Sequence, residues 1–210
     1  MTDTWATVAS LATAGGTLVL AIATFAAVRS ASRAARATER ALQVGIRPVL
    51  ATTRFEDATQ KISFLDRWVK VEGGRAFVDV TDEAIYLVIP IRNVGNGIAV
   101  LDRWDFRVYR EDEERAHGDP ATFRRLTRDI FVAPSDIGFW QGALRDPEEP
   151  AFAEVRQAIE QRQRLLIDVL YADHEGGQRT ITRWGLTPHE SGVWLPTVTA
   201  HWNLDRDDPR

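Results

Sequence analysis

The 210-residue chain contains no cysteine. It therefore has neither a disulfide framework nor a thiolate zinc site, and the absence fits a reducing compartment. Lysine is nearly absent as well, because only Lys61 and Lys70 occur among 26 basic residues. Arginine supplies almost all of the positive charge.

Motifs that carry catalysis or cofactor binding are also missing. The sequence has no G-x-S-x-G elbow, H-E-x-x-H pair, phosphate-binding loop or glycine-rich dinucleotide fingerprint. Asn93-x-Gly95-x-Gly97 is too short for such a fingerprint and predicts a turn between two strands. We therefore predict no catalytic, cofactor-binding or metal-ligating residue and no cofactor. This favours a non-enzymatic role and leaves the question of an enzyme open.

Four histidines are the remaining candidates for site chemistry. Asp173-His174-Glu175 places three potential metal ligands together, but adjacent residues in a turn point in different directions. His189 and His117 lie in other loops, and His201 alternates with Trp202 on the last expected strand. Solvated or hydrogen-bonded histidines are the simpler interpretation at each place.

Charge is divided unevenly along the chain. Residues 29–47 contain five arginines and one acid, whereas the chain from Pro48 onward contains 21 basic and 28 acidic residues. Phosphate neutralisation needs clustered positive charge, so this acidic part is a poor nucleic-acid binder. We expect no nucleic-acid partner.

From Trp5 to Val28 the chain runs for 24 residues without a charge. A helix of that length spans roughly 36 Å and can cross a hydrocarbon core of ~30 Å. A cleaved signal peptide is the main rival, but the leading MTDT carries an acid and no basic residue, and the apolar stretch is too long. A buried core helix fits the flanking tryptophan and arginines poorly. We predict one transmembrane helix over residues 5–28.

Arginines follow this helix directly, at positions 29, 33, 36 and 40. By the positive-inside rule they place the N-terminus outside and the rest of the chain in the cytoplasm, as a single-pass protein of the cell membrane. Their spacing puts them on one face of a helix that continues as a basic juxtamembrane stalk to residue 47, where Pro48 ends it.

The stalk has three open interpretations. Arg29 and Arg33, nearest the membrane, are predicted to contact anionic lipid headgroups. A weak parallel pairing of anchor and stalk would instead make a homodimer, and a solvated spacer would have no partner.

Residues 48–210 have the pattern of one mainly β domain. The expected strands are 48–55, 62–71, 76–80, 84–92, 98–109, 164–172, 178–186 and 192–203. Pro90 cannot donate to a ladder and indicates an edge strand or a bulge. Residues 111–119 predict a charged loop, Asp119-Pro120 a short helix, and residues 150–163 a second helix. Short strands with one or two inserted helices predict a β-sandwich.

The hairpin around residues 174–177 allows a prediction of register. A symmetric turn pairs Asp168 with Arg183 and Ile167 with Trp184. Asp168 stands between two leucines and would otherwise be a suspicious buried acid. A cross-strand ion pair, contributing roughly 0.2–1 kcal/mol, is the plainer explanation.

Several segments together resemble a family of uncharacterised actinobacterial membrane proteins. The matching residues are Arg47-Pro48, Asn93-Val94-Gly95-Asn96-Gly97-Ile98-Ala99, Tyr171-Ala172-Asp173, Gln178-Arg179-Thr180 and His201-Trp202-Asn203-Leu204-Asp205. The resemblance covers most of the chain and implies an N-terminal helix and stalk followed by an immunoglobulin-like β domain. This chain departs from the family at Ile98, where a proline is common. The resemblance implies no activity and no functional residue.

Two functional hypotheses remain. The first is a membrane-anchored interaction or accessory module whose β domain binds a protein partner. The alternative is a membrane-tethered enzyme or small-ligand binder with an acid–histidine site around Asp173, His174 or His201. A deep polar pocket would favour the alternative, and an exposed tryptophan or apolar patch would favour the module.

Overall fold

The computed structural model describes residues 2–110 and 116–205, without the side chains of residues 2–10, 12, 40 and 44. The side chains of Trp5 and Arg40, and residues 111–115 of the expected charged loop, therefore lie outside the described part. The chain divides into two compact units between Gly45 and Ile46. Each unit is described by itself.

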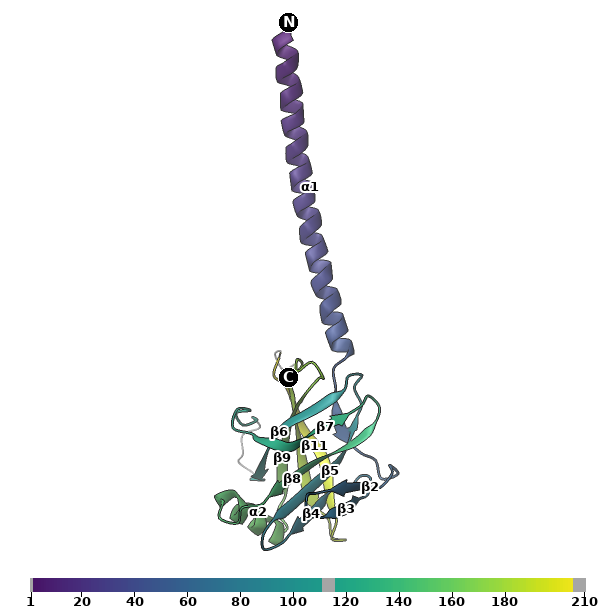
Figure 1. Ribbon diagram of the computed structural model, residues 1–210, viewed down its shortest axis with the longest axis vertical. Coiled ribbons are helices and arrows are strands. Elements are labelled where there is room, and N and C mark those ends of the chain that lie inside the picture. The colour runs from purple at the N-terminus through teal and green to yellow at the C-terminus, as the bar shows by residue number, and fades with distance from the viewer. Residues whose placement is uncertain (1, 111–115, 206–210) are drawn as a thin grey trace. The chain divides into compact units, whose positions relative to one another are not determined.

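The first unit is a single helix, α1 (Thr2–Gly45), which is uninterrupted (Figure 1). Neither glycine nor proline breaks the stretch from Arg29 to Val44, which explains why the helix continues there. Its range Thr13–Gln43 contains an 18-residue window with a mean hydropathy of 1.5, so by length and composition it can cross a membrane. Leu18, Leu20 and Ile22 within it are exposed. Apolar side chains that find no protein neighbour are typical of a lipid-facing helix.

The second unit is mainly β, as the sequence predicts. Its elements are β1 (Leu50–Thr52), β2 (Gln60–Ser63), β3 (Trp68–Val71), β4 (Phe77–Val80), β5 (Ile85–Asn93), β6 (Ala99–Val108), β7 (Arg124–Val132), β8 (Ile137–Leu144), α2 (Pro150–Glu160), β9 (Leu165–Ala172), β10 (Thr180–Pro188) and β11 (Trp194–Asn203).

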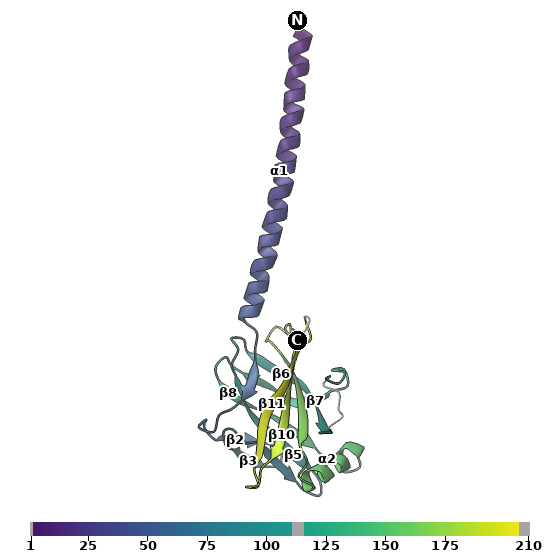
Figure 2. The same ribbon diagram turned by 180° about the vertical axis from the view of Figure 1, so that it is seen from behind.

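These strands form three antiparallel sheets. In the first sheet β5 pairs with β8 on one side and with β1 and β4 on the other. The second sheet has the order β11-β10-β9-β6-β7, and β2 and β3 form a two-stranded ribbon. Figure 2 shows the second sheet from behind, with β10 and β11 side by side.

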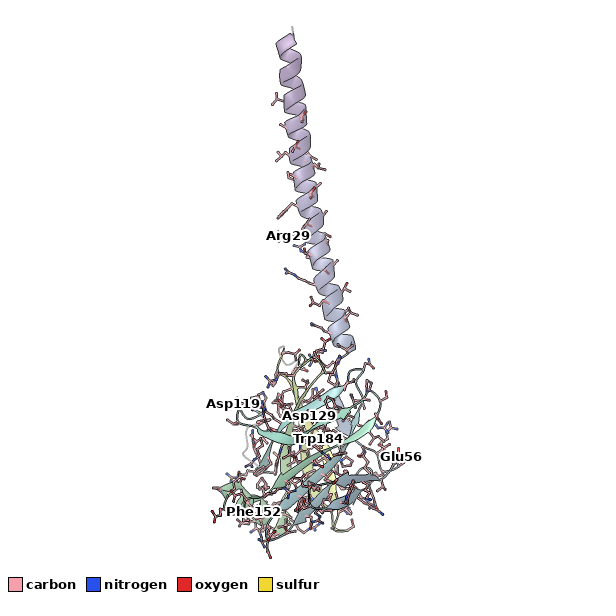
Figure 3. The ribbon with its side chains drawn as sticks, in the orientation of Figure 1. Arg29, Glu56, Asp119, Asp129, Phe152 and Trp184 are labelled. Atoms are coloured by element: carbon pink, nitrogen blue, oxygen red, sulfur yellow. The ribbon has the colours of Figure 1, made fainter. Side chains whose placement is uncertain are left out.

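One hydrophobic core lies between the first two sheets. Alternate residues of β5, such as Ile89 and Ile91, meet Ile167 and Trp184 of the second sheet, and Phe152 of α2 joins the same cluster. Trp184 and Phe152 are labelled in Figure 3. The ribbon of β2 and β3 packs on other residues of the first sheet through a second cluster that contains Phe64, Val69, Tyr86 and Val88. The two alternating faces of β5 therefore serve two separate cores.

Pro90 does not mark an edge or a bulge, so that prediction is wrong. β5 is an internal strand, and Pro90 pairs in unbroken register with Phe139 of β8. On the other side β4 pairs with residues 85–88 and β1 with residues 91–93. Pro90 therefore falls in the gap between β1 and β4, where no ladder needs its missing N–H.

Three further details differ from the sequence predictions. The expected strand 62–71 is two strands, β2 and β3, joined by a tight turn in which Phe64 N–H donates to Arg67 O at 2.8 Å. Asp119-Pro120 opens a turn instead of a helix: the Asp119 carboxylate accepts the Ala121 N–H at 2.9 Å, and the chain enters β7 at Arg124. β7 and β8 were not predicted. Only one inserted helix, α2, occurs among the described residues.

Candidate functional site

Arg29 and Arg33 are exposed on α1, inside the candidate membrane-spanning range. Arg29 projects from the helix in Figure 3. Because both guanidinium groups are exposed, they are available to lipid headgroups. Headgroup contact at Arg29 and Arg33 remains a prediction.

The turn at Asp173-His174-Glu175 is held by its own acid. Asp173 is buried, and its Oδ1 accepts the backbone N–H of Glu175 at 3.1 Å and of Gly177 at 2.9 Å. His174 and Glu175 are exposed. Among the described residues no group of three or more histidine, cysteine or acidic side chains is placed to hold a metal ion. The carboxylate of Asp173 stabilises the turn between β9 and β10.

His201 belongs to a network of hydrogen-bonded side chains that does not include Asp173. Its Nδ1 is 2.9 Å from Thr182 Oγ1, which in turn lies 3.1 Å from the hydroxyl of Tyr171. The Tyr171 hydroxyl also accepts the Leu50 N–H at 3.2 Å. Burial raises the pKa of Tyr171 to about 12, so the hydroxyl stays protonated at neutral pH. These hydrogen bonds connect β9, β10 and β11 to the start of β1.

Arg47 forms a second polar cluster, called here the Arg47 clasp, with Thr180, Asn203 and Asp205. Its Nη1 donates to Asn203 Oδ1 at 2.7 Å and to Thr180 Oγ1 at 3.3 Å, and its Nη2 donates to Asp205 Oδ2 at 2.5 Å. Arg47 is buried. The clasp fastens the first residues of the β unit to its last strand, and a buried arginine needs such partners.

The glycine turn lies against the same segment. The Asn93 side chain accepts the Val49 N–H at 3.2 Å and donates to Gly97 O at 2.6 Å. A Cβ on Gly97 would stand 1.7 Å from Ile46 O, so only glycine fits there. Arg47, Val49, Asn93 and Gly97 thus lie together at the start of the β unit.

Asp168 and Arg183 form the predicted ion pair, which is confirmed. The two residues face each other in the β9–β10 ladder, with Ile167 opposite Trp184. Arg183 Nε lies 2.6 Å from Asp168 Oδ1 and Nη2 lies 2.8 Å from Oδ2, and both side chains are buried. The Arg183 guanidinium also stacks on Trp202, 4.9 Å from the ring centroid. A bidentate buried pair of this kind is structural.

Asp105 lies on the same face of the second sheet as Asp168. It lies opposite Asp168 in the β6–β9 ladder, with Arg107 Nε at 3.7 Å from its Oδ2. Burial raises its pKa, and the neighbouring charge of Asp168 adds to the increase while Arg107 opposes it.

The turn between β2 and β3 exposes two large apolar side chains. Leu65 is 94 % exposed and Trp68 is 63 % exposed, and Lys61 Nζ lies 4.8 Å from the Trp68 ring centroid. Phe64 beside them is buried in the second core cluster and holds the turn in place. We call Leu65 and Trp68 the ribbon tip. An exposed tryptophan is a typical anchor of protein interfaces, and the exposed leucine beside it adds apolar surface.

A cleft of about 170 Å³ lies next to the ribbon tip, and Leu65 forms part of its wall. Residues 124–127 of β7 form one side and residues 141–143 of β8 the other, while Trp104 also contributes to the lining. Arg124, Arg125 and Arg145 line the cleft, and none of the acidic residues that the structure describes does. The cleft thus combines positive charge with aromatic and aliphatic surface.

The sequence did not predict this cleft, because it indicated a short helix after Asp119-Pro120 and no strand between residues 121 and 149. A signal was present: two runs rich in β-branched and aromatic residues, 124–132 and 137–144, flank Ala133-Pro134-Ser135-Asp136. The ribbon tip could not be predicted, because residues 62–71 have the pattern of one strand and the structure contains a turn between β2 and β3 there.

No protein-family model matches this chain, and a search of curated proteins finds no match. A search of solved structures finds the crystal structure of a protein from Archaeoglobus fulgidus, which is 13 % identical and has a TM-score of 0.27. The similarity covers 61 % of this chain and 93 % of that chain. A TM-score this low assigns neither fold nor function.

Proposed function

We propose that this chain is a single-pass membrane-anchored module that binds a protein partner through its β domain. In this proposal α1 crosses the cell membrane with the N-terminus outside, and the β domain is an immunoglobulin-like sandwich in the cytoplasm. The exposed apolar face of α1 supports anchoring. The arginines that follow residue 28 support the orientation.

The ribbon tip is the observation that carries the binding role. Most large apolar side chains of the β unit are buried, and Phe55 and Phe131 are exposed singly in other parts of the unit. Leu65 in the turn and Trp68 at the start of β3 are exposed together at one end of a ribbon whose other apolar side chains are packed. Holding these side chains in water is unfavourable, since burying one fully is worth roughly 1.5–3 kcal/mol. A partner surface that covers both would recover this free energy.

A membrane-tethered enzyme or small-ligand binder with an acid–histidine site is the second candidate, and the geometry supports it less. The Asp173 carboxylate accepts hydrogen bonds from its own turn. His201 is engaged with Thr182 on a different strand. The residues on which that alternative depended do not converge.

Co-purification of the tagged full-length chain from native membranes after chemical crosslinking tests the proposal. We expect a partner protein that is recovered with the native chain and lost with the variant Leu65→Ser/Trp68→Ser. A double variant at exposed polar positions of another loop, Glu190→Ser/Ser191→Ala, is the matched control and should retain the partner. Equal recovery with both variants, or no partner with either, would contradict the proposal.

A further inference from the structure

The two strands that form the walls of the cleft each have a free edge. β7 pairs with β6 and β8 pairs with β5, and among the described residues no backbone hydrogen bond joins β7 to β8. The strands follow each other in the chain but belong to different sheets (Figure 1). Backbone donors and acceptors at a free edge are a template for an added strand.

Positive charge is concentrated along this edge although the β domain as a whole is acidic. β7 carries Arg124, Arg125 and Arg128 and a single acid, Asp129. Arg125 lies directly opposite Arg103 of β6, and like charges in such a cross-strand pair repel. An anionic group bound beside them would relieve this repulsion.

The arginines of the cleft have N–H donors that can still bind a ligand. Arg124 is paired with Glu149, and Arg145 Nη2 lies 3.0 Å from Asp66 Oδ1. Arg125 has no ion-pair partner among the residues that the structure describes. A guanidinium has five N–H donors, so a single pairing leaves Arg145 able to bind a further carboxylate.

We infer that the cleft between β7 and β8 binds an extended acidic segment of the partner protein by strand addition. The inference rests on the proposed function, because Leu65 belongs both to the ribbon tip and to the wall of the cleft. The backbone of the segment pairs with a free edge, its acidic side chains meet Arg125 and Arg145, and an apolar side chain packs on Leu65, the exposed apolar residue of the lining. A lipid headgroup is less suitable, because it has no backbone amides with which to complete a ladder.

Peptide binding to the full-length chain in phosphatidylcholine nanodiscs tests the inference. The probe is a fluorescein-labelled octapeptide of alternating glutamate and valine, measured by fluorescence anisotropy. Two controls are the lysine–valine peptide and a glutamate–valine peptide with N-methylated backbone amides. We expect the first peptide to bind at least about tenfold more tightly than either control, because the lysine peptide loses the ion pairs with arginine and the N-methylated peptide loses several backbone hydrogen bonds.

Substitutions then locate the site. Arg125→Gln and Arg145→Gln should each weaken binding several-fold. Arg179→Gln, at an exposed arginine outside the cleft, should leave it unchanged. Thermal unfolding of each variant checks that the fold is retained.

The remaining outcomes overturn the inference in distinguishable ways. Equal binding of the N-methylated peptide would show an anion site without strand addition. Arginine-dependent binding of phosphatidylglycerol vesicles, with no peptide binding, would show a lipid site. If no peptide binds but the partner is still lost with Leu65→Ser/Trp68→Ser, the result contradicts this inference alone. If no peptide binds and the partner is not lost with that variant, the result contradicts the proposed function as well.

Discussion

Arg47 and Asn203 are separated by 156 positions in sequence, yet Arg47 Nη1 donates to Asn203 Oδ1 at 2.7 Å. The same guanidinium reaches Asp205 at 2.5 Å. Arg47, two residues beyond the end of α1, is therefore bonded to the end of β11. In the Arg47-Pro48 pair, proline keeps Arg47 out of a helical conformation, and the arginine side chain fastens the chain where the β unit begins.

Loss of the Arg47 clasp should destabilise the β unit. Arg47→Met would leave polar groups of Thr180 and Asn203 without their partner in a buried place. We expect a loss of about 2–4 kcal/mol in the free energy of unfolding. Arg75→Met, which breaks an exposed pair with Glu72, should cost less than about 1 kcal/mol. Chemical denaturation of both variants makes the comparison, and equal small losses would contradict a structural role for Arg47.

The buried pair of Asp168 and Arg183 should behave differently in single and double variants. Arg183→Met leaves the buried Asp168 carboxylate beside Arg107, whose Nη2 lies at 3.8 Å, and we expect a loss of about 3–5 kcal/mol in the free energy of unfolding. Asp168→Leu/Arg183→Met removes both charges and should restore most of that loss. A double-mutant cycle from urea unfolding measures the coupling free energy between the two side chains. If the losses of the single variants add up to the loss of the double variant, the two side chains are not coupled and the prediction is contradicted.

Asp105 should make stability depend on pH. Burial raises its pKa in the folded state above the ordinary value of 3.8, so the folded protein holds this proton more tightly than the unfolded chain does. The contribution is fully present below pH 3.8 and is lost as the pH rises through the raised pKa. Asp105→Asn should therefore gain stability relative to the native chain as the pH rises across that window. A difference between the two unfolding curves that is flat with pH would contradict this assignment.

The central β elements could be predicted from the sequence because strict alternation set the buried face. Ile85, Leu87, Ile89 and Ile91 enter one core, and the symmetric turn fixed the pairing of Asp168 with Arg183. Pro90 could not be placed, because only the tertiary arrangement shows that β1 and β4 leave a gap beside it. The cleft is likewise non-local, since it arises where β7 and β8 separate into different sheets.

Anchoring and orientation can be tested cleanly because the chain has no cysteine. Thr2→Cys and Ser191→Cys place single thiols near the N-terminus and in an exposed loop of the β unit. In intact cells a membrane-impermeant maleimide should label the first and not the second, and lysis should expose both. Labelling of the Ser191 variant in intact cells would reverse the proposed orientation. Release of the chain by alkaline carbonate would contradict a transmembrane anchor.

Site-specific photo-crosslinking in native membranes tests the central claim most directly. A benzoylphenylalanine replaces Leu65 at the ribbon tip in the full-length chain, and the same probe replaces Glu190 as the control. The account predicts one discrete adduct with a partner protein from position 65, weakened by Trp68→Ser and absent from position 190. Adducts of equal yield at both positions, or none at position 65, would contradict a protein-binding role for the β domain.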